Sequence, residues 1–286
     1  GHEFPMNTGS SSSPLIFYKG RAYLVPDIFA QNFAFNYTFD EQSRIVSVSN
    51  YSENPVVFTN MSIDSANDIY ITSIQYPQIS SLANENAAAK INAELRSSAV
   101  NAIDVGLQNA FENSLVNRRF PDRNGITAET NFNYAITYNQ NGLLSLKTDE
   151  YQYAGGAHGS TIQTGYTFDL ETGDRIKLSD LLNGGYLPVI NAEIRRQIDE
   201  RVKAGQLFEN TKFETITDET GFYLSDKGIV IFFQQYEYFP YAAGIQEFTI
   251  PYCMLKDYLQ AEFAYLCSEQ PSATSLTAGN NLMTVG

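Results

Sequence analysis

One segment constrains the fold more than any other, because residues 84–116 have the pattern of a single long amphipathic helix. Its apolar positions recur every four residues, at Ile91, Leu95, Ala99, Ile103, Leu107, Phe111 and Leu115. An α-helix turns once in about 3.6 residues, so a step of four drifts slowly around its surface. We therefore expect this helix to wrap obliquely over a sheet, with Gly106 marking a close contact or a bend.

The segments on either side of this helix alternate as strands do. A strand at 69–76 precedes the helix, and two long strands follow it, joined at Asn139–Gly142, where the Asn-Gly step predicts a hairpin. Strand pairs at 162–178 and 222–235 flank a second helix, which has Pro188 in its first turn. Regular βαβ units are missing from this order. The predicted fold class is α+β, a mostly antiparallel sheet packed by a few amphipathic helices.

Charge and composition exclude several functions. The chain has 286 residues, with 32 acidic and 18 basic side chains and a formal charge of −14. Such an acidic protein repels phosphate backbones, so nucleic acid is not expected as a partner. No apolar run approaches the roughly 18 residues of a membrane helix, so no transmembrane segment is expected. A charged partner, if there is one, should be cationic.

Histidine and cysteine are scarce in the sequence. The only histidines are His2 and His158, so we expect neither a metal site nor a cofactor. Cys253 and Cys267 lie late in the chain. If residues 252–267 form one helix, the two cysteines are about 21 Å apart, beyond the reach of a disulfide. We therefore expect core or surface thiols rather than redox chemistry.

Four parts are expected along the chain. They are a flexible leader at 1–13, a small β-rich unit at 14–60, the α+β domain at 61–267 and a polar tail at 268–286. The first and last parts are rich in Ser, Gly, Thr and Asn. No signal peptide precedes them, so for a secreted protein we presume that it has been removed.

The β-rich unit consists of short alternating segments. Two strands are expected around a Lys-Gly turn in 17–23, one or two helical turns in 25–32, and two more strands in 33–39 and 44–49. This arrangement resembles the copper amine oxidase N-terminal-like domain, common in secreted proteins of Gram-positive bacteria. The resemblance implies neither copper nor oxidase activity, and the chain lacks the corresponding quinone-precursor motif.

The segment Tyr151–Ser160 is the most unusual one, because three glycines surround a lone histidine at the end of a strand. His158, together with Ser160, could act in catalysis, but no Gly-x-Ser-x-Gly elbow is present. In the alternative interpretation, the imidazole bonds to the backbone and shapes the loop.

A second segment, Tyr236–Gly244, holds four aromatic residues around Pro240, directly after an apolar strand. Aromatic side chains make good binding anchors, and they equally fold back over a sheet edge. Several carboxylates, Asp149, Glu150, Glu237 and Glu247, are conceivable as a hydrolytic pair, although solvated charge is the simpler interpretation.

Taken together, these segments resemble the extracellular domain of the RsiV-type anti-sigma factors. The signature is Gly-Gly-Ala-His-Gly, followed by Tyr-x-Tyr-x-Pro-Tyr-Ala-x-Gly, and the resemblance covers about 69–266. The strand and long helix before the first motif look like the PdaC-type module that usually accompanies that domain. Well-understood members of the family bind lysozyme over its substrate cleft. The resemblance implies that binding involves Ala157, His158, Ser160, Tyr238, Pro240 and Tyr241.

Three functions are therefore weighed. The first is a secreted or surface-exposed, non-enzymatic bacterial binding or sensor domain, whose partner is a cationic protein such as lysozyme or a cell-wall glycan. The second is a peptidoglycan-modifying hydrolase that uses His158 or a carboxylate pair. The third is a structural wall-associated module. The chain has no sigma-binding segment and no polysaccharide deacetylase domain, so neither signalling nor deacetylation is inherited from the resemblance.

Overall fold

The computed structural model describes residues 53–120, 125–207 and 212–267 in full, and the backbone of five further strands. The chain forms two compact units. One comprises Gly1–Glu53 and Glu269–Gly286, and the other is Asn54–Ser268. The boundary expected at residue 61 therefore falls inside the first strand of the second unit. That strand is the first arm of a long hairpin. Its first residues show no clear alternation of apolar and polar side chains, so the sequence did not indicate that the strand begins before residue 61.

In the first unit, two small antiparallel sheets are described. Strands lie in the segments where alternation predicted them, whereas the leader and the helical turns expected at 25–32 are outside the described residues. A further strand lies in the expected polar tail and pairs with the unit. The strands are β1 (Leu15–Tyr18) paired with β2 (Arg21–Leu24), and β13 (Thr274–Thr277), β4 (Ile45–Asn50) and β3 (Phe35–Asp40) in that order.

The second unit contains a five-stranded sheet in the order β5-β6-β7-β8-β9. Its strands are β5 (Val57–Ala66), β6 (Tyr70–Ser80), β7 (Ala128–Gln140), β8 (Leu143–Tyr153) and β9 (Ser160–Asp169). Neighbouring strands are antiparallel except β6 and β7, which the long helix connects in parallel. The predicted Asn-Gly hairpin is present, with φ of 55° at Asn141 and 78° at Gly142.

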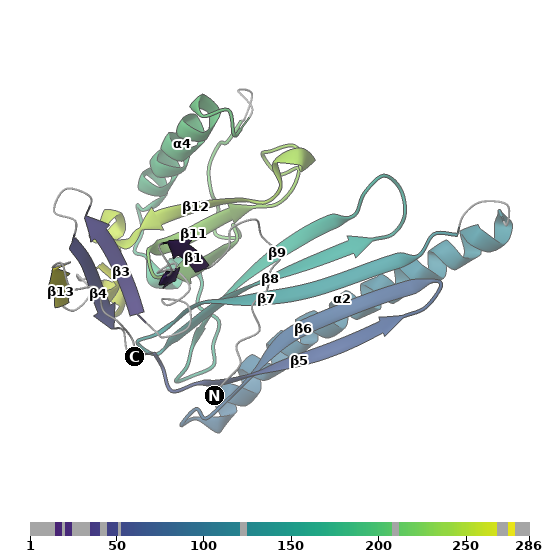
Figure 1. The fold of residues 1–286 in the computed structure, drawn as a ribbon, viewed down its shortest axis with the longest axis horizontal. Coiled ribbons are helices and arrows are strands. Elements are labelled where there is room, and N and C mark those ends of the chain that lie inside the picture. The colour runs from purple at the N-terminus through teal and green to yellow at the C-terminus, as the bar shows by residue number, and fades with distance from the viewer. Residues whose placement is uncertain are drawn as a thin grey trace. The chain divides into compact units, whose positions relative to one another are not determined.

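The long helix α2 (Glu85–Arg119) begins at Asn84, whose side-chain oxygen accepts hydrogen bonds from the backbone of Asn86 and Ala87. It lies along β5, β6 and β7 (Figure 1). Its first half packs Ile91 and Leu95 against apolar side chains of β8 and β9. This confirms the helix and its position on a sheet.

The buried face of α2 differs from the expected stripe in its second half. After Ala99 the buried positions are Ala102, Gly106, Ala110 and Asn113, whereas Leu107 is 50% exposed and Phe111 is 63% exposed. Each step of four residues turns about 40° too far, so a stripe of that period leaves the sheet within a few turns. A Cβ on Gly106 would clash with Tyr70 and Thr130, so this glycine marks a close contact.

A second sheet, in the order β10-β11-β12, carries the largest apolar core. Its strands are β10 (Phe222–Ser225), β11 (Gly228–Phe233) and β12 (Gln246–Pro251). The helices of this part are α3 (Leu178–Leu181), α4 (Leu187–Lys203), η1 (Tyr241–Ala243), η2 (Tyr252–Leu255) and η3 (Ala261–Cys267). Figure 1 shows α4 beside β12, away from the five-stranded sheet. The unit is thus α+β with mostly antiparallel strands, as predicted.

The closing segment is not the single helix that the cysteine argument assumed. Two separate 3-10 helices fold back on each other, and the Cys253 thiol donates a hydrogen bond to the Cys267 carbonyl at 3.1 Å. The 21 Å separation, an order-of-magnitude figure for a straight helix, is therefore wrong. Among the helices of the described residues, none is long and apolar enough to span a membrane.

The rotation of the buried face can be tested by two leucines on α2. Leu95 is 1% exposed, so Leu95→Ala should lower the free energy of unfolding by about 2–5 kcal/mol. Leu107→Ala should lower it by less than about 1 kcal/mol, because half of that side chain is in water. Urea denaturation of both variants checks this. Equal losses would place Leu107 in the core and contradict the structure.

Candidate functional site

The His158 loop connects β8 to β9 and is shaped by its glycines. Gly155 and Gly156 have φ of 92° and 99°, a region that other residues rarely adopt. Tyr153 Oη donates to the Gly156 carbonyl at 3.1 Å, and His158 Nδ1 lies 2.9 Å from the Gly159 carbonyl. This is the arrangement of the alternative interpretation, in which the imidazole bonds to the backbone of its own loop.

The aromatic loop between β11 and β12 is also held by its own backbone. Tyr236 has φ of 68°, its amide donates to the Phe239 carbonyl at 3.0 Å, and Gly244 ends η1 with φ of 69°. The Glu237 carboxylate accepts a hydrogen bond from the backbone N–H of Gln234 at 2.9 Å. The loop therefore has a defined shape, in which Tyr236 and Glu237 are exposed while Tyr238 and Phe239 pack toward the core.

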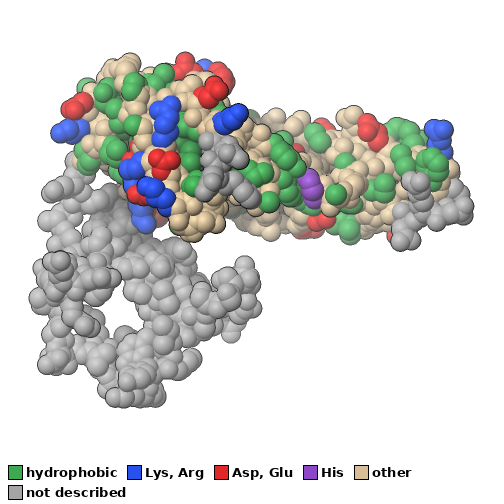
Figure 2. All heavy atoms as spheres, turned by 90° about the horizontal axis from the view of Figure 1, so that it is seen from above, with side chains coloured by type: hydrophobic (Ala, Val, Ile, Leu, Met, Phe, Trp, Pro, Cys, Tyr) green, Lys and Arg blue, Asp and Glu red, His purple; other side chains and the backbone are tan. Residues whose placement is uncertain are grey.

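The two loops meet through their rings. His158 and Tyr241 stack with ring centroids 3.8 Å apart and planes inclined by 20°, and Tyr236 lies 5.7 Å from Tyr241. Tyr236 is 65% exposed. In Figure 2 the purple histidine is at the surface among green and tan atoms. We call Ala157, His158, Ser160, Tyr236, Pro240 and Tyr241 the two-loop surface; all of them are exposed except Tyr241, which is half-buried.

Five of the six predicted binding residues belong to this surface, and Tyr238 does not. Its ring packs edge-on against Phe233 at 4.9 Å and Phe213 at 5.3 Å, and its hydroxyl donates to the Thr215 carbonyl at 3.1 Å. It therefore contributes to the core beneath the loop. Tyr236 takes its place at the surface, and no pattern in the sequence distinguished it from Tyr238.

Two glutamines that sequence reasoning missed attach the aromatic loop to the edge of β9. The backbone N–H of Gln163 donates to Gln234 Oε1 at 3.0 Å, and the backbone carbonyl of Gln163 accepts from Gln234 Nε2 at 2.7 Å. The Thr161 amide donates to Gln235 Oε1 at 3.0 Å. The side-chain amides thus pair with the strand as a neighbouring backbone would. They hold the two loops in register.

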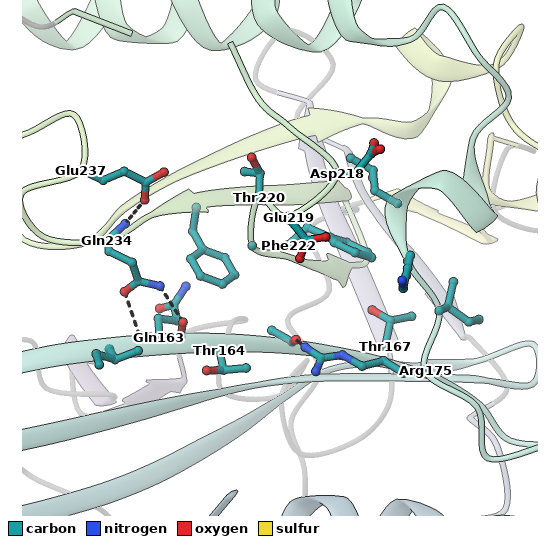
Figure 3. Close-up of a pocket in the computed structure, with 17 residues that line it drawn as sticks. Gln163, Thr164, Thr167, Arg175, Asp218, Glu219, Thr220, Phe222, Gln234 and Glu237 are labelled. Atoms are coloured by element: carbon teal, nitrogen blue, oxygen red, sulfur yellow. Dashed lines mark hydrogen bonds between the residues drawn. The ribbon is translucent and has the colours of Figure 1, made fainter. Parts of the chain in front are cut away.

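A pocket of about 460 Å³ lies along β9 beside these glutamines. Figure 3 shows Gln234 reaching Gln163 at one end and Arg175 lying along the strand at the other. Arg175 donates to the Gly165 carbonyl at 2.5 Å and to Glu94 at 3.3 Å, and its guanidinium lies 4.5 Å from the Tyr166 ring. These contacts already use the guanidinium of Arg175. The side chain therefore lines the pocket and is not free to bind an anion.

Of the four carboxylates considered for hydrolysis, only Asp149 and Glu247 lie near each other. Glu237 bonds to its own loop, and Glu150 accepts from Gln152 at 3.0 Å. Asp149 and Glu247 both interact with Lys147, whose ammonium is 2.7 Å from Glu247. No group of three metal-ligating side chains occurs within the described ranges.

The pKa values of Asp149 and Glu247 are shifted in opposite directions. Burial raises the pKa of Asp149, and the Lys147 charge offsets this only in part. Burial also raises the pKa of Glu247, but hydrogen bonds from Lys147, Gln163 and Tyr223, together with the Lys147 charge, outweigh it and lower the net pKa. A carboxyl with a raised pKa beside one with a lowered pKa can hold and release a proton, which is the chemistry a hydrolytic pair needs.

Comparisons with known proteins match two consecutive parts of the chain. A family model described as Deacetylase PdaC matches residues 63–161, and one described as Protein of unknown function (DUF3298) matches residues 179–253. The chain carries a PdaC/DUF3298-type module. Within this module, the His158 loop comes from the PdaC match and the Tyr241 loop from the DUF3298 match. A comparison with curated proteins gives no match.

Solved structures support the fold of the PdaC/DUF3298-type module. A DUF3298 family member from Bacteroides fragilis superposes with a TM-score of 0.60 at 16% identity, covering 76% of this chain and 99% of its own. A DUF3298 family protein from Pseudomonas aeruginosa gives a TM-score of 0.54 at 15% identity, covering 74% and 97%. At these identities the likeness concerns the fold alone.

The Lys147 ion pair generates a pH-dependent prediction. In the folded state the pKa of Glu247 lies below its ordinary value of 4.5, so its ionised form stabilises the fold above that pH, and this stability is lost as the pH falls through the folded pKa. Lys147→Met should lower the free energy of unfolding by about 1–3 kcal/mol at pH 7. The loss should shrink below about pH 4.5, because Glu247 is then protonated in the variant.

Urea denaturation at pH 7 and at pH 4 measures this difference. Lys90→Met is the matched control, because it removes an exposed ion pair to Asp174 and should change stability much less. A loss from Lys147→Met that is independent of pH would show that packing of the lysine stem, rather than its charge, matters.

Proposed function

We propose that this protein is a bacterial extracellular or cell-surface domain that binds a cationic protein without catalysing a reaction, with lysozyme as the candidate partner. The observation that carries the proposal is the stacking of His158 on Tyr241, which joins two distant loops into one exposed aromatic surface. This also supports the resemblance to the RsiV-type anti-sigma factors, whose recognition surface uses the same two loops. A cell-wall glycan is the other candidate partner.

The organisation of the two-loop surface suits recognition. Tyr236 and Tyr241 have few rotatable bonds, so burying them against a partner costs little conformational entropy. The Gln234 and Gln235 hydrogen bonds hold the loops before any partner arrives. Such preorganisation lowers the cost of association.

The charge of the chain suits a cationic partner. A net charge of −14 accelerates encounter with a basic protein and makes the rate fall with added salt. The two-loop surface itself consists of aromatic, small and uncharged polar side chains together with His158. We therefore expect long-range charge to control the association rate and the aromatic contacts to control dissociation.

A peptidoglycan-modifying hydrolase is the second candidate, and one observation favours it. Asp149 and Glu247 flank Lys147 and have pKa values displaced in opposite directions. The name Deacetylase PdaC belongs to the matched family, and this chain would share that chemistry only if it acts on cell-wall glycans. Release of reducing sugar or free amine from purified cell walls, lost in Asp149→Asn or His158→Ala, would support this candidate over the binding domain.

The binding proposal predicts that Tyr241 and His158 act as a pair. In calorimetric titrations with a c-type lysozyme, Tyr241→Ala and His158→Ala should each raise the Kd more than about fivefold. The double variant should lose less binding free energy than the two single variants lose in sum, because each ring supports the other. Raising the salt concentration should weaken binding by the wild-type chain.

Phe111→Ala is the control for these titrations, since it removes an exposed aromatic ring on α2 and should leave the Kd unchanged. Muramyl oligosaccharides are titrated in parallel. Binding of the oligosaccharides alone, with the same loss in Tyr241→Ala, would assign the two-loop surface to a glycan instead. If neither ligand binds, the proposed function is wrong.

A further inference from the structure

The two edges of the five-stranded sheet differ. Along β9, Gln234, Gln235 and Arg175 take outward backbone groups, and the Ile176 amide donates to the Thr167 carbonyl at 2.8 Å. Along β5, pairing reaches β6 on one side, and none of the strands in the described part of the chain pairs with its other side. The sheet therefore has one closed edge and one open edge.

The backbone groups at the open edge can be assigned. The Asn67 amide donates to the Tyr70 carbonyl at 3.0 Å, so in this antiparallel ladder the odd-numbered residues of β5 bond to β6. The even-numbered residues then point their N–H and C=O groups outward, and these are Phe58, Asn60, Ser62, Asp64 and Ala66. An extended strand is the structure that pairs with such a row of alternating donors and acceptors.

The open edge has few of the features that protect edge strands, and Asp64 is the one charged side chain of β5. Sheet proteins commonly block an edge with Lys, Pro, a bulge or a short strand. β5 has ten residues, contains neither Lys nor Pro, and pairs with β6 without a register shift. Ile63 is 40% exposed on the same side of the sheet as α2. Unprotected edges of this kind are used for strand addition by peptides.

An apolar groove runs beside this edge. A cavity of about 520 Å³ between the β5–β6 hairpin and α2 is lined by Met61, Tyr76, Ala89, Ala93 and Arg96, among others. From Arg96, steps of three or four residues lead along the same side of α2, through Val100, Ile103, Leu107 and Phe111. Of these, Leu107 and Phe111 are stripe positions that the second half of α2 leaves exposed, and they extend the line of helical residues that begins at the cavity.

Charge along this groove specifies the partner further. Arg96 and Arg118 lie on this side of α2, and neither makes an ion pair with a described residue. They stand out in a chain of net charge −14. A carboxylate on the partner would pair with Arg96 next to the apolar positions.

We propose that the edge of β5 and the adjacent groove of α2 form a second binding site, which takes an extended peptide segment of another protein. The segment adds to β5 as a sixth strand, alternate apolar side chains lie on Val100, Leu107 and Phe111, and an acidic side chain faces Arg96. This site is separate from the two-loop surface and does not depend on the function proposed for it.

A second copy of this chain fits the groove less well than a peptide does. Pairing two β5 edges would place the two β6 strands three strand spacings apart, or about 14 Å. Helices lying over those strands would then be well beyond the 8–10 Å at which helices pack, so both apolar stripes would stay uncovered. Repulsion between two chains of −14 adds to this.

The experiment uses the full chain and a displayed library of eight-residue peptides that alternate apolar and random polar residues. Peptides enriched on the wild-type chain are synthesised, and their binding is measured by fluorescence polarisation. Ser62→Pro removes one outward N–H and no hydrogen bond to β6, so it should weaken binding at least tenfold. Ser62→Ala is the matched control and should not change the Kd.

Two further changes test the groove and the charge. Phe111→Ser should weaken binding severalfold, and Arg96→Ala should do so only for peptides that contain an acidic residue. If Ser62→Pro does not fold, the same peptides with N-methylated amides at the paired positions should fail to bind the wild-type chain. Lysozyme titrations should be unaffected by any of these changes.

Two outcomes would overturn the proposal. One is that no peptide is enriched on the wild-type chain relative to Ser62→Pro. The other is that light scattering shows a dimer of the wild-type chain that Ser62→Pro converts to a monomer, which would make β5 a self-association edge. Loss of lysozyme binding alone would bear on the proposed function and leave this site intact.

A different observation carries a second inference, which concerns the cysteines. The geometry assigns Cys253 and Cys267 as an oxidisable pair. Cys253 is exposed, its thiol donates to the Cys267 carbonyl at 3.1 Å, and the neighbouring Cys253 thiol raises the pKa of Cys267. A disulfide between them would join η2 to the last described residue of η3. It would close the segment that contributes Leu255, Leu259 and Leu266 to the largest core.

The test exposes the full chain to oxidised glutathione. The two thiols lose two protons and two electrons, the sulfur–sulfur bond forms, and one oxidised glutathione becomes two reduced ones. Peptide mapping should find the Cys253–Cys267 link, and the oxidised chain should unfold at a higher urea concentration than the reduced chain. Cys253→Ser should abolish both effects. If only glutathione adducts or linked dimers form, the assignment is wrong.

Discussion

The closed edge of β9 is the constraint on which the candidate site depends. This strand pairs with β8 on one side, and on the other it is held by the side-chain amides of Gln234 and Gln235. The Thr161–Gln235 bond connects the end of the part that matches PdaC to the part that matches DUF3298, and the Gln163–Gln234 bonds follow two residues beyond the PdaC match. Since each loop of the two-loop surface belongs to a different part, the ring stacking follows from this pairing.

Much of the fold could be predicted from local patterns. The Asn-Gly turn and the long helix each follow from a local residue pattern, and both are present. The rotation of α2 could not be predicted, because it depends on which side chains the sheet can accept. Beyond Ala99, Tyr70 and Thr130 fill the space next to the helix, so only small residues fit there.

For the site, the two loops could be predicted from the sequence, but the contact between them could not. A glycine-rich loop and an aromatic loop stand out in composition, whereas their contact depends on β9 and on two glutamines that follow no periodic pattern. Tyr238 illustrates the limit most clearly. Aromatic residues two positions apart in a turn look alike in sequence, and only the fold determines that Tyr236 faces solvent while Tyr238 packs on Phe233. The cysteine pair was missed because a chain reversal replaced the assumed helix.

The contrast between the two sheet edges bears on what the molecule does. Polar side chains close β9 completely enough to hold a rigid surface, while β5 keeps its outward backbone groups and a neighbouring apolar stripe in water. An exposed apolar stripe favours aggregation, and the repulsion that comes with a charge of −14 opposes it. A chain that retains both the stripe and the open edge gains from them only if another strand binds there. The closed edge suits recognition by a preformed surface, and the open edge suits recognition by strand addition.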